Sequence, residues 1–537
     1  MRTTASSLLR SLADPGLLRL RAAAVTYLTA LIGGVAAALL ATRFDLGVSI
    51  VVFAVMLAIT FTAERAGAGT RQRLVSLLVM PIAGIAAGGV AALLFAVPPL
   101  GDALFVLVVS GAIWLRRFGR VAARIGTLIS LPFITVLVVP APAGHGSGFA
   151  LLTPLVALLV AVVAFGVQWI AGVTAFSPPR TSANRDAARA SRGEASGVRS
   201  SPSARRPGVA RLPASTRMAV QMAITLSAAF LIGHIVFGEH WFWLVLTAFI
   251  VASGNRGRGD VLYKGIHRTV GAAAGTVLAA ALVVLGPTRV TGGAADATVI
   301  AIAVILALGL WLRPAGYGWW AAAVTAMLSL LHELSGTEAD SAMLIRLGAI
   351  VVGGVLSTAI AWWVMPVRTG DVLRRRTADA LAAISELLVG CIRESDAVAP
   401  LRAAADDALA GLEQLAPTLR LERAVRGLGR PRTDRSAGSG AAADHRADVI
   451  PVVRSCWAPA DAIAASVEHG HPLAPPHAKA LGAIARRLGG YRRMLAGAPA
   501  PEPGERAPGT ADGAIAELDA TVDELAAPLS RVARAAG

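Results

Sequence analysis

The sequence predicts an all-α integral membrane protein with two parallel six-helix transmembrane repeats and a C-terminal cytosolic helical domain. Charged residues make up only 15% of the 537 residues, and the mean hydropathy is +0.64, whereas an average soluble domain has about 25% charged residues. Long apolar runs alternate with short arginine-rich segments, and about 20 helical residues cross a bilayer core that is ~30 Å thick. A motif that returns after 197 residues predicts the duplication.

Twelve apolar segments are expected to form the membrane helices. Residues 1–176 form the first repeat and residues 217–366 the second, each with six segments. The expected positions are 22–41, 46–62, 74–97, 100–115, 125–139 and 150–175 in the first repeat, and 218–237, 241–253, 269–286, 297–312, 318–334 and 344–365 in the second.

The arginines predict the orientation, because loops that stay in the cytoplasm retain positive charge. The N-terminus and every second loop are basic. These segments contain Arg10, Arg19 and Arg21; Arg65, Arg71 and Arg73; Arg116, Arg117, Arg120 and Arg124; Arg256, Arg258, Lys264 and Arg268; Arg313; and Arg368 and Arg374–Arg376. The other loops contain little beyond Arg43, Arg289 and, at a helix mouth, Arg346. The basic side is therefore expected to be cytoplasmic.

Two correspondences indicate that the halves are copies. The motif "WLRRFG" at residues 114–119 returns as "WLRPAG" at 311–316, and Arg73 and Arg268 open the third helix of their sets 195 residues apart. A six-helix repeat begins and ends on the same side, so the two copies are expected to be parallel. In many transporters built from repeats, the substrate route lies at the interface between them.

Two regions outside the repeats differ in composition. The linker, residues 177–216, is rich in Ser, Pro, Gly and Arg, so we expect a disordered basic tether against anionic lipid head groups. Residues 367–537 repeat apolar residues at i, i+3 and i+4, which predicts a cytosolic helical bundle. The segment 430–446 interrupts this pattern and is expected to be a flexible insert.

Motifs and charge distribution exclude several function classes. The glycine-rich stretch "GNRGRGD", residues 254–260, is not followed by GK[ST] and follows no strand, which argues against a phosphate loop, and topology explains most of its charge. Basic residues are spread over all inner loops, which argues against nucleic-acid binding. No motif resembles an ATPase or another enzyme.

Neither a disulfide framework nor a metal or other cofactor is expected. Cys391 and Cys456 lie far apart and form no CxxC pattern. A proline-rich loop explains the histidine-rich stretch 469–477 better than a metal site, since no second cluster of ligands completes a tetrahedron.

Polar residues gather at the ends of the expected helices, and the helix centres contain almost no charge. A relay of acids in the middle of the membrane is therefore not expected. The outer ends contain the candidate proton-coupling residues His234, Glu239, His240, His332 and Glu333, because histidine takes up protons near neutral pH. The candidate substrate ligands are Arg268, Trp241, Trp243, Asn255, Arg256 and Arg73.

Three features of the second half carry a resemblance to a known family. They are the aromatic helix start at Trp241, the pattern R-x-x-G-x-x-x-G of Arg268, Gly271 and Gly275, and the closing helix "RLGAIVVGGVLSTAIAWWVMP" with Arg346, Gly353, Gly354 and Pro366. With these features, residues 217–366 resemble the fusaric acid resistance and aromatic acid exporter family of bacterial membrane proteins. The first half has Ser76 and Met80 in place of the two glycines and resembles the family in topology alone.

The resemblance implies efflux of aromatic carboxylic acids or related organic anions across the bacterial inner (plasma) membrane, with possible coupling to protons. It also implies kinship with plant aluminium-activated malate channels. A passive organic-anion channel and a non-transporting assembly or scaffold protein of the envelope are the alternatives, and the lack of acids in the middle of the membrane favours the channel. The expected partners are a small organic acid and the lipid bilayer; a homo-oligomer and an accessory envelope protein stay open.

The best candidate site is the helix 241–253, which spans only about 20 Å and is too short for the hydrocarbon core. Its tryptophans offer an apolar slot for a ring, and Arg268 offers a cation for a carboxylate. Each feature also has a structural interpretation. The tryptophans are typical interfacial anchors, Arg268 is also explained as a lipid anchor, and Gly271, Gly275 and Gly353 are typical of close helix packing.

The predicted topology is testable by cysteine labelling. In a variant that lacks Cys391 and Cys456, a cysteine at position Ser191 in the linker should stay unreactive towards an impermeant reagent added outside intact cells, and should react once the membrane is opened. Reaction in intact cells would contradict the parallel six-plus-six arrangement.

Overall fold

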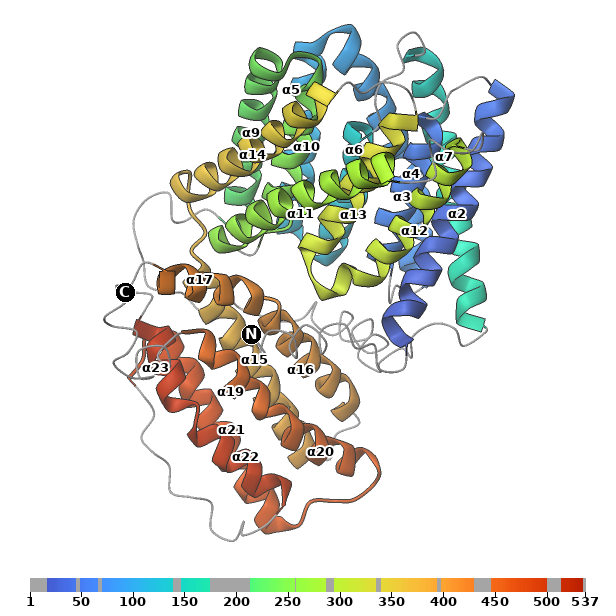
Figure 1. Cartoon of the computed structure of the whole chain (residues 1–537). Helices are drawn as coiled ribbons and strands as arrows, with labels where there is room; N and C mark the ends of the chain where they lie inside the picture. Colours follow the sequence, from blue (N-terminus) through green and yellow to red (C-terminus); the bar gives the residue numbers. More distant parts are fainter. Residues whose placement is uncertain are drawn as a thin grey trace. The chain divides into compact units, whose positions relative to one another are not determined.

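The structure, a computed structural model, consists of α-helices and short helical turns in the part of the chain that it describes, with no strand there (Figure 1). The described residues are 17–44, 49–65, 70–138, 146–173, 213–255, 257–285, 294–334, 340–393, 397–428, 446–499 and 513–534. The linker 177–216 and the insert 430–446 lie almost entirely outside these ranges, so the predictions for them stay predictions.

The chain divides into two compact units. Among the described residues, the membrane unit contains 17–173, 213–255 and 264–366, and the helical unit contains 257–263 and 367–534. The division places the loop after residue 255 and the first residues of the following helix with the C-terminal helices, although they lie in the middle of the second apolar set.

The membrane unit has a helix at the position of each expected apolar segment. These helices are α2 (Leu18–Phe44), α3 (Ser49–Arg65), α4 (Thr70–Ala96), α5 (Pro98–Trp114), α6 (Arg120–Val138), α7 (Gly146–Val173), α9 (Ala214–Ile232), α10 (Trp241–Ala252), α11 (Arg258–Leu285), α12 (Ala294–Leu312), α13 (Tyr317–Leu334) and α14 (Asp340–Trp363). Among the described residues, eight segments are long and apolar enough to cross a membrane. The prediction of an α-helical membrane protein is confirmed, and the repeat layout stays a prediction.

The end of α9 differs from the expected span 218–237. The α-helix ends at Ile232, a π-helical turn follows over Gly233–Phe237, and a 3₁₀ turn over Gly238–His240 leads into α10. The wider turn has a local cause, since Gly233 lies against Trp241, where a Cβ would be 3.1 Å from the tryptophan Cβ. The irregular turn places His234 beside the start of α10.

Helix α10 is short and mostly buried within the protein. It has 12 residues, about 18 Å of helix, and nine of these residues are buried. A helix surrounded by protein does not have to cover the hydrocarbon thickness, because its ends meet neighbouring helices rather than lipid. The expectation of a short second helix agrees with this element.

Two pairs of helices in the second set run parallel and pack closely. Along α10 and α14, Ser357 donates a hydrogen bond to the carbonyl of Ala248 at 3.3 Å, and a Cβ on Gly353 would lie 3.0 Å from the carbonyl oxygen of Leu244. Along α11 and α13, a Cβ on Gly275 would lie 2.3 Å from the carbonyl oxygen of Ala322. A side chain at Gly275 would therefore collide with backbone, and one at Gly353 would fit only if the neighbouring backbone gave way slightly.

The motif that marks the halves has the same local form in both. The helices α5 and α12 each lead into a 3₁₀ turn, Leu115–Phe118 and Arg313–Ala315, and a glycine follows. The guanidinium of Arg117 lies 4.9 Å from the ring centre of Trp114, and that of Arg313 lies 5.3 Å from the ring centre of Trp320. Cation–π contacts at both turns are typical of arginines at a membrane interface.

The helical unit has a core of its own. Its helices are α15 (Thr369–Ile392), α16 (Val398–Glu413), α17 (Ala416–Leu428), α19 (Val449–Ser455), α20 (Trp457–Glu468), α21 (Pro475–Leu495), α22 (Ala514–Asp523) and α23 (Ala526–Arg534). Leucines, isoleucines and valines of these helices fill the core. The thiols of Cys391 and Cys456 are buried, and burial raises the pKa of each to about 11, so both stay protonated at neutral pH.

The helical unit also holds residues 257–263. The backbone N–H of Arg258 donates to the carbonyl of Val367 at 3.0 Å, and that of Gly259 donates to the hydroxyl of Thr369 at 3.1 Å. Gly257 has a φ of +137°, which side-chain-bearing residues rarely adopt. In the glycine-rich stretch, the first residues of α11 are therefore hydrogen-bonded to the segment at the start of α15.

The packing of α11 on α13 gives a testable prediction. Gly275→Ala should lower the free energy of unfolding by about 1–3 kcal/mol, because the new Cβ pushes against backbone that cannot rotate away. The matched control is Gly166→Ala in α7, where a Cβ would meet nothing within 4 Å. Thermal unfolding of the purified protein should show a lower midpoint for Gly275→Ala alone. Equal midpoints for the two variants would contradict the close packing.

Candidate functional site

Arg268 lies inside the membrane unit. It belongs to α11, its side chain is 2% exposed, and its Nε atom has no hydrogen-bond acceptor among the described residues. The guanidinium interacts electrostatically with Tyr317, the first residue of α13. An arginine stays charged at all physiological pH values, so a buried guanidinium with an unused donor has unmet capacity to bind an anion.

Asn255 and Lys264 form the turn between α10 and α11. The Lys264 ammonium donates to the carbonyl of Ser253 at 2.8 Å and to Asn255 Oδ1 at 3.1 Å, and Asn255 Nδ2 donates to the carbonyl of Ala252 at 2.7 Å. These bonds satisfy carbonyls that the end of α10 leaves open. The contacts give Asn255, a predicted substrate ligand, a structural function in the turn.

Two further predicted ligands are not described at side-chain level. Arg256 lies outside the described residues, and Arg73 lies in the first turn of α4 with a side chain that the structure does not describe. Their role as substrate ligands stays a prediction.

Trp243 packs against a second buried arginine. The guanidinium of Arg346 lies 3.9 Å from the ring centre of Trp243 and donates to Ser329 Oγ at 2.9 Å and to the carbonyl of Thr325 at 3.2 Å. Arg346 is 1% exposed and Trp243 2%. Arg346 lies in the second turn of α14, which begins at Asp340, and its partners come from α10 and α13; its expected position at a helix mouth stays a prediction.

The two arginines lie at different levels of the same helix. Arg268 is beside Tyr317, and Arg346 is bonded to Ser329. Twelve residues of α13 separate these partners, which corresponds to about 18 Å of helix. Trp243 lies at the second level, with Arg346.

His234 forms an ion pair with an acid of the first half of the chain. His234 Nε2 lies 3.0 Å from Oδ2 of Asp102 in α5, and the two side chains are 34% and 17% exposed. The imidazole stacks on Phe230 and lies 5.1 Å, centre to centre, from the ring of Trp241. Asp102 Oδ1 is buried and has no hydrogen-bond partner among the described residues. The pair is a protonatable site beside the aromatic start of α10.

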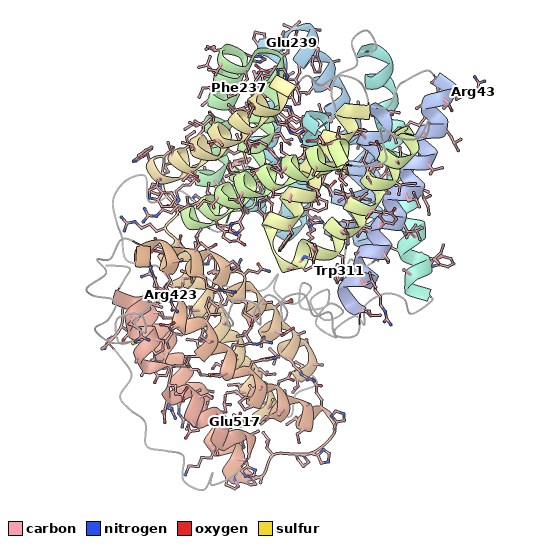
Figure 2. The ribbon with its side chains drawn as sticks, in the orientation of Figure 1. Arg43, Phe237, Glu239, Trp311, Arg423 and Glu517 are labelled. Carbon is pink, nitrogen blue, oxygen red and sulfur yellow. The ribbon has the colours of Figure 1, made fainter. Side chains whose placement is uncertain are left out.

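The other predicted proton-coupling residues are less closely placed. Glu239 is exposed and His240 is half-buried, both in the turn before α10. Figure 2 shows Glu239 and Phe237 at the same end of the membrane unit as Arg43, and Trp311 towards the other end. His332 and Glu333 lie in the last turn of α13, and the structure does not describe their side chains.

The remaining predictions concern the three packing glycines and the histidine-rich stretch 469–477. Gly271 and Gly275 face α13, and Gly353 faces α10, at distances that leave no room for a side chain. Among the described residues, no group of three His, Cys, Asp or Glu side chains could hold a metal ion. His469 and His471 lie in the loop before α21, and His477 lies in the first turn of that helix.

Sequence reasoning missed Asp102 and Arg346 as site residues. Each is a single charged residue close to the start of a long apolar segment, and such residues are rare in membrane helices and often functional. That signal was present for both. Their partners were not predictable, because 132 residues separate Asp102 from His234 and because Arg346 meets Trp243 only through the packing of α10 on α14.

The comparison with known families agrees with the second half of the chain. No curated protein matches the chain. The family model described as fusaric acid resistance protein-like matches residues 224–360, a range that contains Trp243, Arg268 and Arg346. The family resemblance predicted from the sequence is thereby confirmed, and residues 224–360 of this membrane protein form a fusaric acid resistance protein-like region.

Proposed function

We propose that this protein exports organic anions, in particular aromatic carboxylic acids, across the bacterial inner membrane. The observation that carries the proposal is the buried guanidinium of Arg268, with an unused N–H donor, in the family-matched region. A charge inside a membrane protein is costly and marks a substrate pathway by default. A membrane transporter is also the function that the family match and the apolar helices suggest.

The chemistry of Arg268 suits a carboxylate. The planar guanidinium donates two parallel hydrogen bonds to a carboxylate, and such charge-assisted bonds are stronger than neutral ones. Tyr317 at the start of α13 lies within electrostatic reach, and its hydroxyl is a further donor. In this proposal the N-terminus, the linker and residues 367–537 are cytoplasmic, and Arg268 receives the acid from that side.

The proposal also includes the coupling of anion export to proton entry. The contact of the Asp102 carboxylate with the His234 imidazole offers a site that can bind a proton, and it lies beside Trp241 at the start of α10. A proton that enters from outside and binds the Asp102 carboxylate would remove its negative charge and so break the ion pair with a protonated His234 while the anion leaves. The pair joins α5 of the first half to the turn after α9 in the second half, so its opening would loosen the two halves there.

A passive anion channel is the second candidate function. The buried arginines support it equally, because an anion pathway does not require coupling. Uptake of radiolabelled hydroxybenzoate into inverted vesicles separates the candidates. Uptake that depends on a pH gradient supports the exporter, uptake without such dependence supports the channel, and no uptake supports a scaffold protein.

Arg268 variants test substrate binding. Arg268→Lys keeps the positive charge but cannot donate two parallel hydrogen bonds to a carboxylate. The KM for hydroxybenzoate uptake should therefore rise about tenfold at unchanged membrane abundance. Arg268→Ala should abolish uptake. Arg313→Ala, which removes another predicted cytoplasmic arginine, is the control for general positive charge. Small and equal effects of Arg268→Ala and Arg313→Ala on uptake would mean that Arg268 helps to set the membrane topology and does not bind the substrate.

The ion pair of Asp102 and His234 gives a pH prediction. In wild-type protein, export should slow as the external pH rises, because fewer protons are then available to enter from outside. His234→Gln and Asp102→Asn should each flatten this dependence. His240→Gln serves as a comparison, because it is the neighbouring histidine in the same turn. An unchanged pH profile in both His234→Gln and Asp102→Asn would remove the pair from the mechanism.

A further inference from the structure

The first turn of α11 takes hydrogen-bond acceptors from the helical unit. The first four backbone N–H groups of an α-helix have no acceptor within the helix. In α11, the N–H groups of Arg258 and Gly259 donate to the carbonyl of Val367 and to the hydroxyl of Thr369. The residue before a helix usually provides such a cap with its side chain, but Gly257 has no side chain. The start of α11 is therefore capped by chain about 110 positions farther along.

The fit around this first turn is close. A Cβ on Gly259 would lie 2.8 Å from Thr418 Cγ2 in α17 and 2.9 Å from Thr369 Oγ1, and both threonines are buried. One turn later, Tyr263 interacts electrostatically with Arg420 of α17. The contacts of α11 with the helical unit therefore extend from its first turn into its second.

The same helix carries Arg268. Helix α11 is continuous over Arg258–Leu285, and Arg268 comes nine positions after Gly259. This separation corresponds to about two and a half turns, or about 14 Å, so the two residues lie on opposite faces of the helix. Beyond Arg268, Gly271 and Gly275 pack on α13. Arg268 is thus between two contacts on different faces, and together they restrict rotation and tilt of the helix.

The chain that provides the acceptors leaves the membrane unit from a fixed point. Gln221 of α9 donates from Nε2 to the carbonyls of Val364 and Met365, at 2.6 Å and 3.3 Å. These carbonyls follow the last residue of α14, where a helix leaves carbonyls without acceptance from its own backbone. The bonds hold the chain two residues before Val367.

From these contacts we propose that the helical unit positions Arg268 through α11, with Thr369 and Thr418 as positioning residues. Neither threonine touches the substrate. Thr369 caps the first turn, Thr418 packs on Gly259, and the helix carries this restraint to the guanidinium. A first turn without its cap frays, and a binding group must be held to within about 0.5 Å to bind its ligand well.

This inference rests on the proposed function, in which Arg268 binds the carboxylate of the substrate. It assigns a function to residues 367–537. Helix α11 lies within the family-matched range 224–360, whereas Thr369 and Thr418 lie outside it. The part of the chain beyond the matched range therefore acts on a binding residue within it.

The test combines hydrogen–deuterium exchange of the purified full-length protein with hydroxybenzoate uptake into inverted vesicles. Thr369→Val keeps the shape of the side chain and removes the acceptor. Amide exchange over residues 258–268 should become several-fold faster, and the KM should rise several-fold at an unchanged maximal rate. Thr369→Ser keeps the hydroxyl and should retain the wild-type values. The matched control is Ser385→Ala, which removes another hydroxyl of α15, bonded to the carbonyl of Ala485, and should change neither value.

A second variant acts through packing. Gly259→Ala should also speed exchange over residues 258–268, because the new Cβ pushes on Thr418. Alanine favours a helix more than glycine does, so helix propensity alone predicts slower exchange. Gly489→Ala in α21, where a Cβ would meet nothing within 4 Å, is the control and should leave both exchange over this range and KM unchanged.

The two measurements separate this inference from the proposed function. If Thr369→Val speeds exchange as far as Arg268 while wild-type vesicles take up no hydroxybenzoate, the positioning stands and transport is wrong. If vesicles take up hydroxybenzoate and Thr369→Val keeps the wild-type KM, transport stands and the positioning is wrong. Faster exchange confined to residues 258–263, or equal effects of Thr369→Val and Ser385→Ala, would also overturn the positioning.

Discussion

The close contact of α11 with α13 at Gly271 and Gly275 is the constraint on which the membrane unit depends. A Cβ on either glycine would lie less than 3.0 Å from backbone atoms of α13, so the two helices can be this close only with glycine at both positions. The contact fixes the register of the helices. It places Arg268 beside Tyr317 at one end of α13 and leaves Thr325 and Ser329, farther along, to contact Arg346 from α14.

Charge inside an apolar bundle links this packing to function. A guanidinium stays charged, and its burial in a membrane protein is unfavourable unless other groups bind it. The described partners of Arg346 include an indole ring, a hydroxyl and a carbonyl. These contacts hold the Arg346 side chain of α14 against α10 and α13.

The sequence predicted most of the helices and less of the site. Apolar segments were predictable because hydropathy is a local property, and the short α10 was predictable from its length. The π-helical turn after α9 was not, because it depends on Trp241 packing against Gly233. Asp102 was missed because its partner lies 132 residues away.

The most direct test of this account is a structure of the protein with 4-bromobenzoate, in which the bromine marks the position of the ring. We expect bromine density near Tyr317 at the start of α13, with the carboxylate on Arg268. Bromine density confined to the lipid-facing surface or to the helical unit, at ligand concentrations that saturate binding, would contradict an anion pathway along α13.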